Sequence, residues 1–157
     1  MRIKLLVIGP TDHPALKELQ QEYLNRLQHY IKFDYIEIPD LKKNKARTVN
    51  DQKDKEGEVL LSKIVPADIL ILLDEVGKPV RSEDFAEELQ GYMNQGHKQL
   101  VFAIGGPYGF STNVYERANR KLSLSAMTFS HQMIRVFFIE QVYRAFTILR
   151  NEPYHHR

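Results

Sequence analysis

An apolar strand runs directly into a glycine-rich loop in the stretch Leu100-Val101-Phe102-Ala103-Ile104-Gly105-Gly106-Pro107-Tyr108-Gly109. Five consecutive apolar residues indicate a buried strand. The glycines let the backbone turn tightly and approach a ligand closely, because no Cβ obstructs it. The stretch therefore predicts a ligand-binding loop at the end of a strand, although a purely structural turn would use glycine in the same way.

The rest of the chain alternates between strand and helix patterns. Further strands are expected at Arg2–Ile8, Phe33–Ile38, Ile69–Leu73 and Leu122–Ser125. Helices are expected around Leu16–Tyr30 and Gln52–Ile64, from an N-cap at Ser82 to near Gly96, after a cap at Ser111 or Thr112, and over Ser130–Arg150. This alternation predicts the α/β class, a parallel sheet with helices on both faces. A length of 157 residues predicts that residues 1–157 form a single domain.

Three loops of such a sheet are candidates for a binding site. They follow Leu73, Ile104 and Ser125, and ligands of open parallel sheets bind beyond the carboxyl ends of the strands. The glycine loop matches neither a Walker A sequence nor the G-x-G-x-x-G spacing, so phosphate binding has no specific support.

Composition excludes several classes of protein. The chain has no cysteine, which rules out a disulfide framework and a thiolate metal site and favours an intracellular, cytoplasmic setting. A formal net charge of +2 indicates no particular partner. No apolar run approaches the ~20 residues that a bilayer span needs, so we expect no membrane association. We also expect no metal cofactor.

From Leu122 onward the chain resembles, nearly residue by residue, the bacterial RlmH family of large-subunit ribosomal RNA methyltransferases, within the SPOUT superfamily. The resemblance extends over the whole chain. The segments that carry it are Ile3–Gly9, Asp54–Glu58, Ile104–Gly109, Leu122–His131, Arg135–Val136, Glu140–Ala145 and Pro153–His155.

The resemblance implies an activity, a fold and partners. It implies methyl transfer from S-adenosylmethionine to N3 of a pseudouridine in the 23S rRNA stem-loop that faces the decoding centre, on the assembled ribosome. It also implies a homodimer and a deep trefoil knot in the C-terminal part, which periodicity alone would not suggest because unknotted connections are the default. Other possibilities are a SPOUT methyltransferase that acts on tRNA, a ribosome-binding protein without catalytic activity, and a nucleotide-dependent enzyme.

The same resemblance assigns cofactor-binding residues in the three candidate loops. They are Leu73, Gly105, Leu124, Ser125, Ala126, Met127, Thr128 and Phe129. Apolar contacts and backbone groups suit an adenine ring, and Gly105 leaves room for it. Without the family, ordinary core packing would be the preferred explanation of Leu73, Met127 and Phe129.

The candidate catalytic residues on the substrate side are His131, Arg135, Tyr154 and His155, with Arg144 as a further possibility. His131 and Arg135 lie one helical turn apart, and an arginine could stabilise negative charge on the base or hold a phosphate. His131 could instead satisfy a backbone group at the start of the helix. The two arginines could belong to a solvated stripe, with Arg144 paired to Glu140.

Two further features suggest partners. The expected last helix is apolar around nearly its whole circumference, which predicts a subunit interface as its cover. The basic cluster Lys42–Arg47 and the tail Asn151–Arg157 are expected to contact RNA, the cluster through phosphates.

Overall fold

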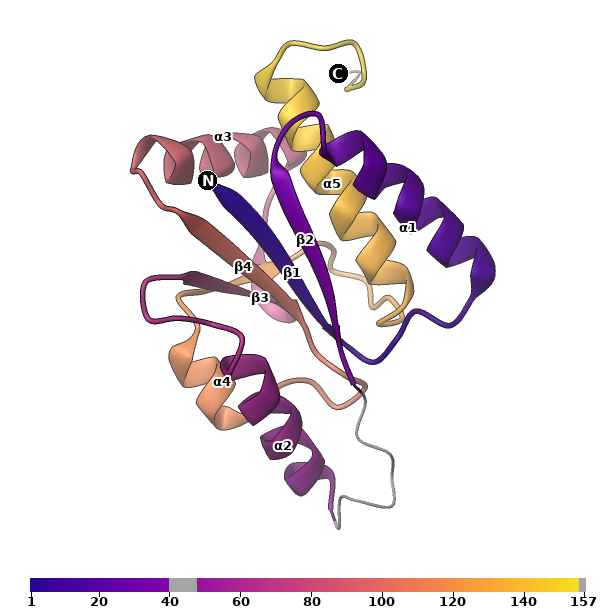
Figure 1. The fold of residues 1–157 in the computed structure, drawn as a ribbon, viewed down its shortest axis with the longest axis vertical. Helices are drawn as coiled ribbons and strands as arrows, with labels where there is room; N and C mark the ends of the chain where they lie inside the picture. Colours follow the sequence, from indigo (N-terminus) through magenta and orange to yellow (C-terminus); the bar gives the residue numbers. More distant parts are fainter. Residues whose placement is uncertain (40–47, 156–157) are drawn as a thin grey trace.

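A five-stranded parallel sheet forms the centre of the computed structural model, which describes residues 1–39 and 48–155 (Figure 1). The strands are β1 (Arg2–Ile8), β2 (Lys32–Ile38), β3 (Ile69–Pro79), β4 (Gln99–Ile104) and β5 (Arg120–Ser123), in the order β2-β1-β4-β3-β5. The helices are α1 (Pro14–Leu27), α2 (Val49–Leu61), α3 (Ser82–Asn94), α4 (Thr112–Arg117) and α5 (Met133–Leu149). The predicted α/β class, with helices on both faces of a parallel sheet, is confirmed.

Successive side chains of β1 point into two different cores, because a strand alternates between the faces of its sheet. Leu5 and Val7 pack in the larger core, which α1, α3 and α5 cover. Leu6 and Ile8 pack in the smaller core, which α2 and α4 cover. All four side chains are buried, which explains why β1 reads as a nearly continuous apolar run.

β3 is longer than expected and is interrupted. Leu73 and Lys78 both pair with Leu122 of β5, so residues 74–77 leave the ladder as a bulge before Pro79 pairs with Ser123. A Cβ on Gly77 would lie 2.5 Å from the carbonyl carbon of Leu122, so only glycine lets β3 return this close to β5. The sequence prediction ended this strand at Leu73, where the continuous aliphatic run stops.

Two expected boundaries are wrong. Leu122–Ser125 was expected as a strand, but β5 begins at Arg120 and ends at Ser123, which leaves Leu124 and Ser125 in the loop that follows. Ser82 was expected as the N-cap of α3, but the cap position is Arg81. The Ser82 hydroxyl instead donates to Oε1 of Gln141 on α5 at 2.8 Å, so a tertiary contact replaces the local cap.

α5 lies between α1 and α3 and is the most deeply buried helix on its face of the sheet. Even so, Met133 and Phe137 each remain 40% exposed. The described part of the chain therefore does not cover the whole apolar circumference of this helix. The trefoil knot implied by the family resemblance stays a prediction, and the basic cluster Lys42–Arg47 lies outside the described residues.

Candidate active site

A cavity of about 590 Å³ lies where the bulge of β3 and the loops after β4 and β5 converge. Its walls are residues 73–75, 104–110, 115, 122–125, 127–131 and 134. The three loops expected to carry a site thus contribute to a single cavity at the carboxyl edge of the sheet. This is where open parallel sheets bind ligands.

The structure brings the predicted cofactor residues together. Those that line the cavity are Leu73, Gly105, Leu124, Ser125, Met127, Thr128 and Phe129. Ala126 lies in the same loop but not on the wall. Ordinary core packing does not explain Met127 and Phe129, which are 76% and 41% exposed, whereas Leu73 belongs to both the core and the cavity wall.

The glycine loop after β4 closes on itself. The amide of Gly109 donates to the carbonyl of Gly106 at 3.0 Å, and Gly109 has φ of 77°, which favours glycine. A Cβ on Gly105 would come within 3.2 Å of the Gly109 backbone, so a larger residue would push the turn open. The loop after β5 is also held locally, because the Ser125 hydroxyl accepts from the Met127 amide at 2.9 Å.

The bulge in β3 places acidic side chains on the cavity wall. Asp74 accepts from the Val76 amide at 3.0 Å and from the Tyr115 hydroxyl at 2.5 Å, while Glu75 beside it is exposed. Burial raises the pKa of Tyr115 to about 12, assisted by this hydrogen bond to Asp74. The sequence predicted a site in the loop that follows Leu73 but did not indicate Glu75 or Tyr115. A pair of acids directly after a buried strand was the available signal.

Arg135 lies in the protein interior and is fully buried. Its guanidinium donates to the carbonyls of Ile8 and Gly9 at 2.7 and 3.0 Å and to the Thr11 hydroxyl at 3.0 Å. Its Nε donates to the carbonyl of His131 at 3.0 Å. The alternative of a solvated stripe is therefore wrong for Arg135. In this conformation the side chain is turned away from the cavity, and its expected contact with the RNA base stays a prediction.

His131 lies on the cavity wall and is half-buried. It is the one predicted substrate-side residue that shares the cavity with the predicted cofactor residues in the described chain. Its backbone carbonyl is held by Arg135, so the start of α5 is fixed in place beside the cavity.

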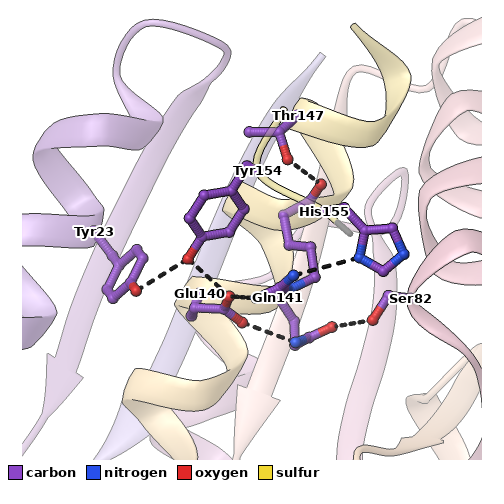
Figure 2. A network of polar contacts seen from close by, with 8 residues as sticks. Tyr23, Ser82, Glu140, Gln141, Thr147, Tyr154 and His155 are labelled. Atoms are coloured by element: carbon purple, nitrogen blue, oxygen red, sulfur yellow. Dashed lines mark hydrogen bonds and ion pairs between the residues drawn. The ribbon is translucent and has the colours of Figure 1, made fainter. Parts of the chain in front are cut away.

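Tyr154 and His155 lie away from the cavity, in a polar network on α5 (Figure 2). The Tyr154 hydroxyl donates to Glu140 at 3.0 Å and lies 3.1 Å from the Tyr23 hydroxyl. Burial, together with these hydrogen bonds, raises the pKa of Tyr154. His155 lies 3.3 Å from both Arg144 and Glu83. The network holds the tail against α5, and the expected Glu140–Arg144 ion pair is part of it.

A second hollow of about 390 Å³ adjoins the cavity. The two share Leu124, Ser125, Phe129 and Ile134, and the hollow continues along α3 and α5 to Phe137 and Gln141. The rings of Phe129 and Phe137 lie 5.0 Å apart, centroid to centroid. An apolar surface therefore extends from the cavity rim along α5.

Two classes of feature are not found in the described residues. Within residues 1–39 and 48–155, no group of three or more His, Asp or Glu side chains could hold a metal ion. No helix in this part of the chain is long and apolar enough to cross a bilayer.

Comparison with known proteins gives a consistent result over the whole length. A family described as "Predicted SPOUT methyltransferase" matches residues 1–155. Proteins named "Ribosomal RNA large subunit methyltransferase H" from Christiangramia forsetii and Flavobacterium johnsoniae are each 60% identical over 157 residues, which covers all of both chains. The protein of that name from Parabacteroides distasonis is 55% identical over 156 residues, or 99% of each chain.

Proposed function

Because this chain belongs to the RlmH family of SPOUT methyltransferases, we propose that it methylates 23S rRNA with S-adenosylmethionine as the donor. The acceptor we propose is N3 of a pseudouridine in the stem-loop that faces the decoding centre, on the assembled ribosome in the cytoplasm. The observation that supports this best is that the segments carrying Leu73, Gly105 and Leu124 converge on one cavity.

The cavity suits the proposed cofactor in size and in chemistry. Its volume of about 590 Å³ is within the range of ~300–1,000 Å³ that small-molecule sites occupy. Leu73, Leu124 and Phe129 offer apolar contacts for an adenine ring. At Gly105, Gly106 and Gly109 of the tight turn, the backbone reaches the wall without a side chain of its own.

Bound there, the cofactor supplies a methyl group on a sulfonium, which is already a good methyl donor. The chain must then orient the base and favour its deprotonated imide nitrogen. We assign His131 to the acceptor side, because its place on the wall puts it beside the donor. Arg135 acts as a positioning residue, since it holds the carbonyl of His131 and ties it to the loop after β1.

We further propose a homodimer in which the tail of one protomer completes the cavity of the other. Ile134 lines the cavity, whereas Arg144, which contacts His155, lies about ten residues further along α5, or ~15 Å along its axis. Tyr154 and His155 are thus far from the cavity of their own chain. The exposed apolar side chains of Met127, Phe129, Met133 and Phe137 supply a surface that a second copy would cover.

The trefoil knot is also part of this proposal, on the ground of family membership. Its test is mechanical. A chain pulled from both ends should stop short of the roughly 520 to 570 Å that 157 extended residues span, because a tightened knot retains chain. Extension to the full length would show that the chain is not knotted.

The function is tested by transfer of labelled methyl from S-adenosylmethionine to assembled ribosomes, separated subunits and tRNA, each from cells that lack the modification. We expect label on assembled ribosomes, at N3 of the stem-loop pseudouridine. Label on tRNA would support the proposed methyl transfer but would replace rRNA by tRNA as the substrate. Cofactor binding without any transfer would favour a ribosome-binding protein that is not an enzyme.

A further inference from the structure

The charge on the cavity wall is uneven. The formally charged side chains on it are the carboxylates of Asp74 and Glu75, and the described lining residues include neither lysine nor arginine. Tyr108, Tyr115 and His131 are the other ionisable side chains on the wall. A ligand in this cavity is therefore exposed to negative charge on the β3 side.

Asp74 reaches the cavity because of the bulge in β3. Leu73 and Lys78 pair with the same residue of β5, so the four residues between them project out of the ladder. Bulges beside sites commonly redirect a side chain in this way. Asp74 is half-buried there, whereas Glu75 is exposed to solvent, which screens its charge.

The Asp74 carboxylate is held in a fixed orientation. One oxygen accepts from the Val76 amide at 3.0 Å, and the other accepts from the Tyr115 hydroxyl at 2.5 Å. The Tyr115 hydroxyl is protonated at neutral pH and therefore acts as the donor in this hydrogen bond. Lys121 is a cation in contact with Tyr115: its ammonium lies 5.0 Å from the centroid of the Tyr115 ring, but the residue is exposed and not on the cavity wall.

We propose that Asp74 makes the cavity select the cationic methyl donor over the neutral product of the transfer. This inference rests on the proposed function. When the methyl group leaves, the electron pair of its bond stays on sulfur, so the sulfonium becomes a neutral thioether and the rest of the cofactor is unchanged. The donor thus carries one more positive charge than the product. A fixed carboxylate stabilises that charge and gains nothing from the thioether.

The consequence is an attraction that is present before methyl transfer and absent after it. Before transfer, the attraction between Asp74 and the sulfonium adds to the affinity of the donor. After transfer, that attraction is lost, and the product dissociates more readily. A carboxylate at ~10 Å from the sulfonium, in surroundings of effective dielectric constant about 20, gives a preference of roughly tenfold.

The inference is tested by calorimetric titration of the intact protein with S-adenosylmethionine and with S-adenosylhomocysteine, its demethylated product. The quantity of interest is the ratio of the two dissociation constants. We expect Asp74→Asn to lower the preference for the donor roughly tenfold, chiefly by weakening donor binding. Asp74→Glu, which keeps the charge, should retain most of the preference and also shows whether the site tolerates substitution.

Glu75→Gln is the matched control, because it removes the same formal charge from the neighbouring, exposed position. It should change the ratio by no more than about threefold. An unchanged ratio in Asp74→Asn, or an equal loss in Glu75→Gln, would overturn the role of Asp74 while leaving methyl transfer intact. If the wild-type protein binds neither compound, the proposed function itself is overturned, and the inference with it.

Discussion

Arg135 Nη1 lies 3.0 Å from the carbonyl oxygen of Gly9, although the two residues are 126 positions apart in the chain. The same side chain holds the carbonyl of His131 on the cavity wall. One arginine thus connects the end of the first strand to the start of the last helix. A fully buried guanidinium is tolerated here because its donors are satisfied by carbonyl and hydroxyl oxygens.

Replacing Arg135 with lysine should destabilise the fold. An ammonium group cannot reproduce the planar fork, so some of the carbonyls at Ile8, Gly9 and His131 would lose their donor. We expect the free energy of unfolding to fall by about 2 to 4 kcal/mol, measured by urea unfolding at fixed protein concentration. Arg150→Lys, at an exposed position, should change it by less than about 0.5 kcal/mol. Equal effects of the two variants would contradict a structural role for Arg135.

Gly77 and Gly91 should respond to alanine in opposite directions. At Gly77 the new methyl group would lie 2.5 Å from the Leu122 backbone, so the variant should lose about 3 kcal/mol or fail to fold. At Gly91, in α3, a Cβ meets nothing within 4 Å. Gly91→Ala should therefore stabilise the protein by about 0.5 to 1 kcal/mol, since alanine is the better helix former. Thermal unfolding of both variants checks this, and a well-folded Gly77→Ala protein would refute the close approach of β3 and β5.

Phe137→Glu should disrupt the proposed dimer. Phe137 is 40% exposed on α5 and its ring contacts that of Phe129, so a carboxylate there would be buried without a partner when two copies associate. Light scattering after gel filtration should report a monomer for this variant and a dimer for the wild type. Val65→Glu, exposed in the segment that leads to β3, is the control and should remain dimeric. A dimeric Phe137→Glu protein would show that the dimer interface does not include Phe137.

Mixed dimers show whether the tail completes the cavity of its own chain or that of the partner. Gly105→Val should block the cofactor cavity, and Tyr154→Ala should remove the tail hydroxyl, so each variant alone should be inactive. If the tail serves the partner's cavity, a dimer of the two variants has one intact site and about half the wild-type methyl transfer. If the tail serves its own cavity, the mixed dimer has no intact site and stays inactive.

Alkaline pH should destabilise the protein through its tyrosines. The pKa of Tyr115 is raised to about 12, mainly by burial, and that of Tyr30 to about 12, mainly by its hydrogen bond to Glu152. A raised folded-state pKa contributes stability that is fully present below the ordinary value of about 10 and is lost as the pH rises toward 12. The free energy of unfolding should therefore decline over this range. Tyr115→Phe should show a shallower decline, and an identical slope would exclude a contribution from this residue.

Much of the fold was predictable because its signals are local. The aliphatic runs of β1, β3 and β4 and the polar breaks between them sufficed to identify a parallel sheet with helices on both faces. The course of β3 beyond Leu73 was not predictable in the same way. Residues 74–77 leave the ladder, and pairing resumes at Lys78 because Gly77 permits a close approach to β5, which is distant in sequence. Ser82 is a second example: serine is favoured at helix N-caps, but here its hydroxyl donates to Gln141, which is distant in sequence.

The candidate site was also predictable only in part. The loops after strands predicted where the cavity would lie, and the family resemblance assigned residues on its wall. The direction of the Arg135 side chain could not be inferred, since an arginine within an otherwise apolar helix usually marks a solvated edge. Only the position of the Ile8 and Gly9 carbonyls beneath α5 explains why it turns inward.

The contact between Gly9 and Arg135 also bears on how the chain folds as it is synthesised. The loop after β1 is made before α5, and its Gly9 carbonyl gains its arginine donor only 126 residues later. At typical rates of synthesis this delay is roughly 6 to 25 s. Early segments can collapse in that time, yet the interior stays open to water until α5 arrives. The loop after β1 therefore reaches its final packing only after α5 has been synthesised.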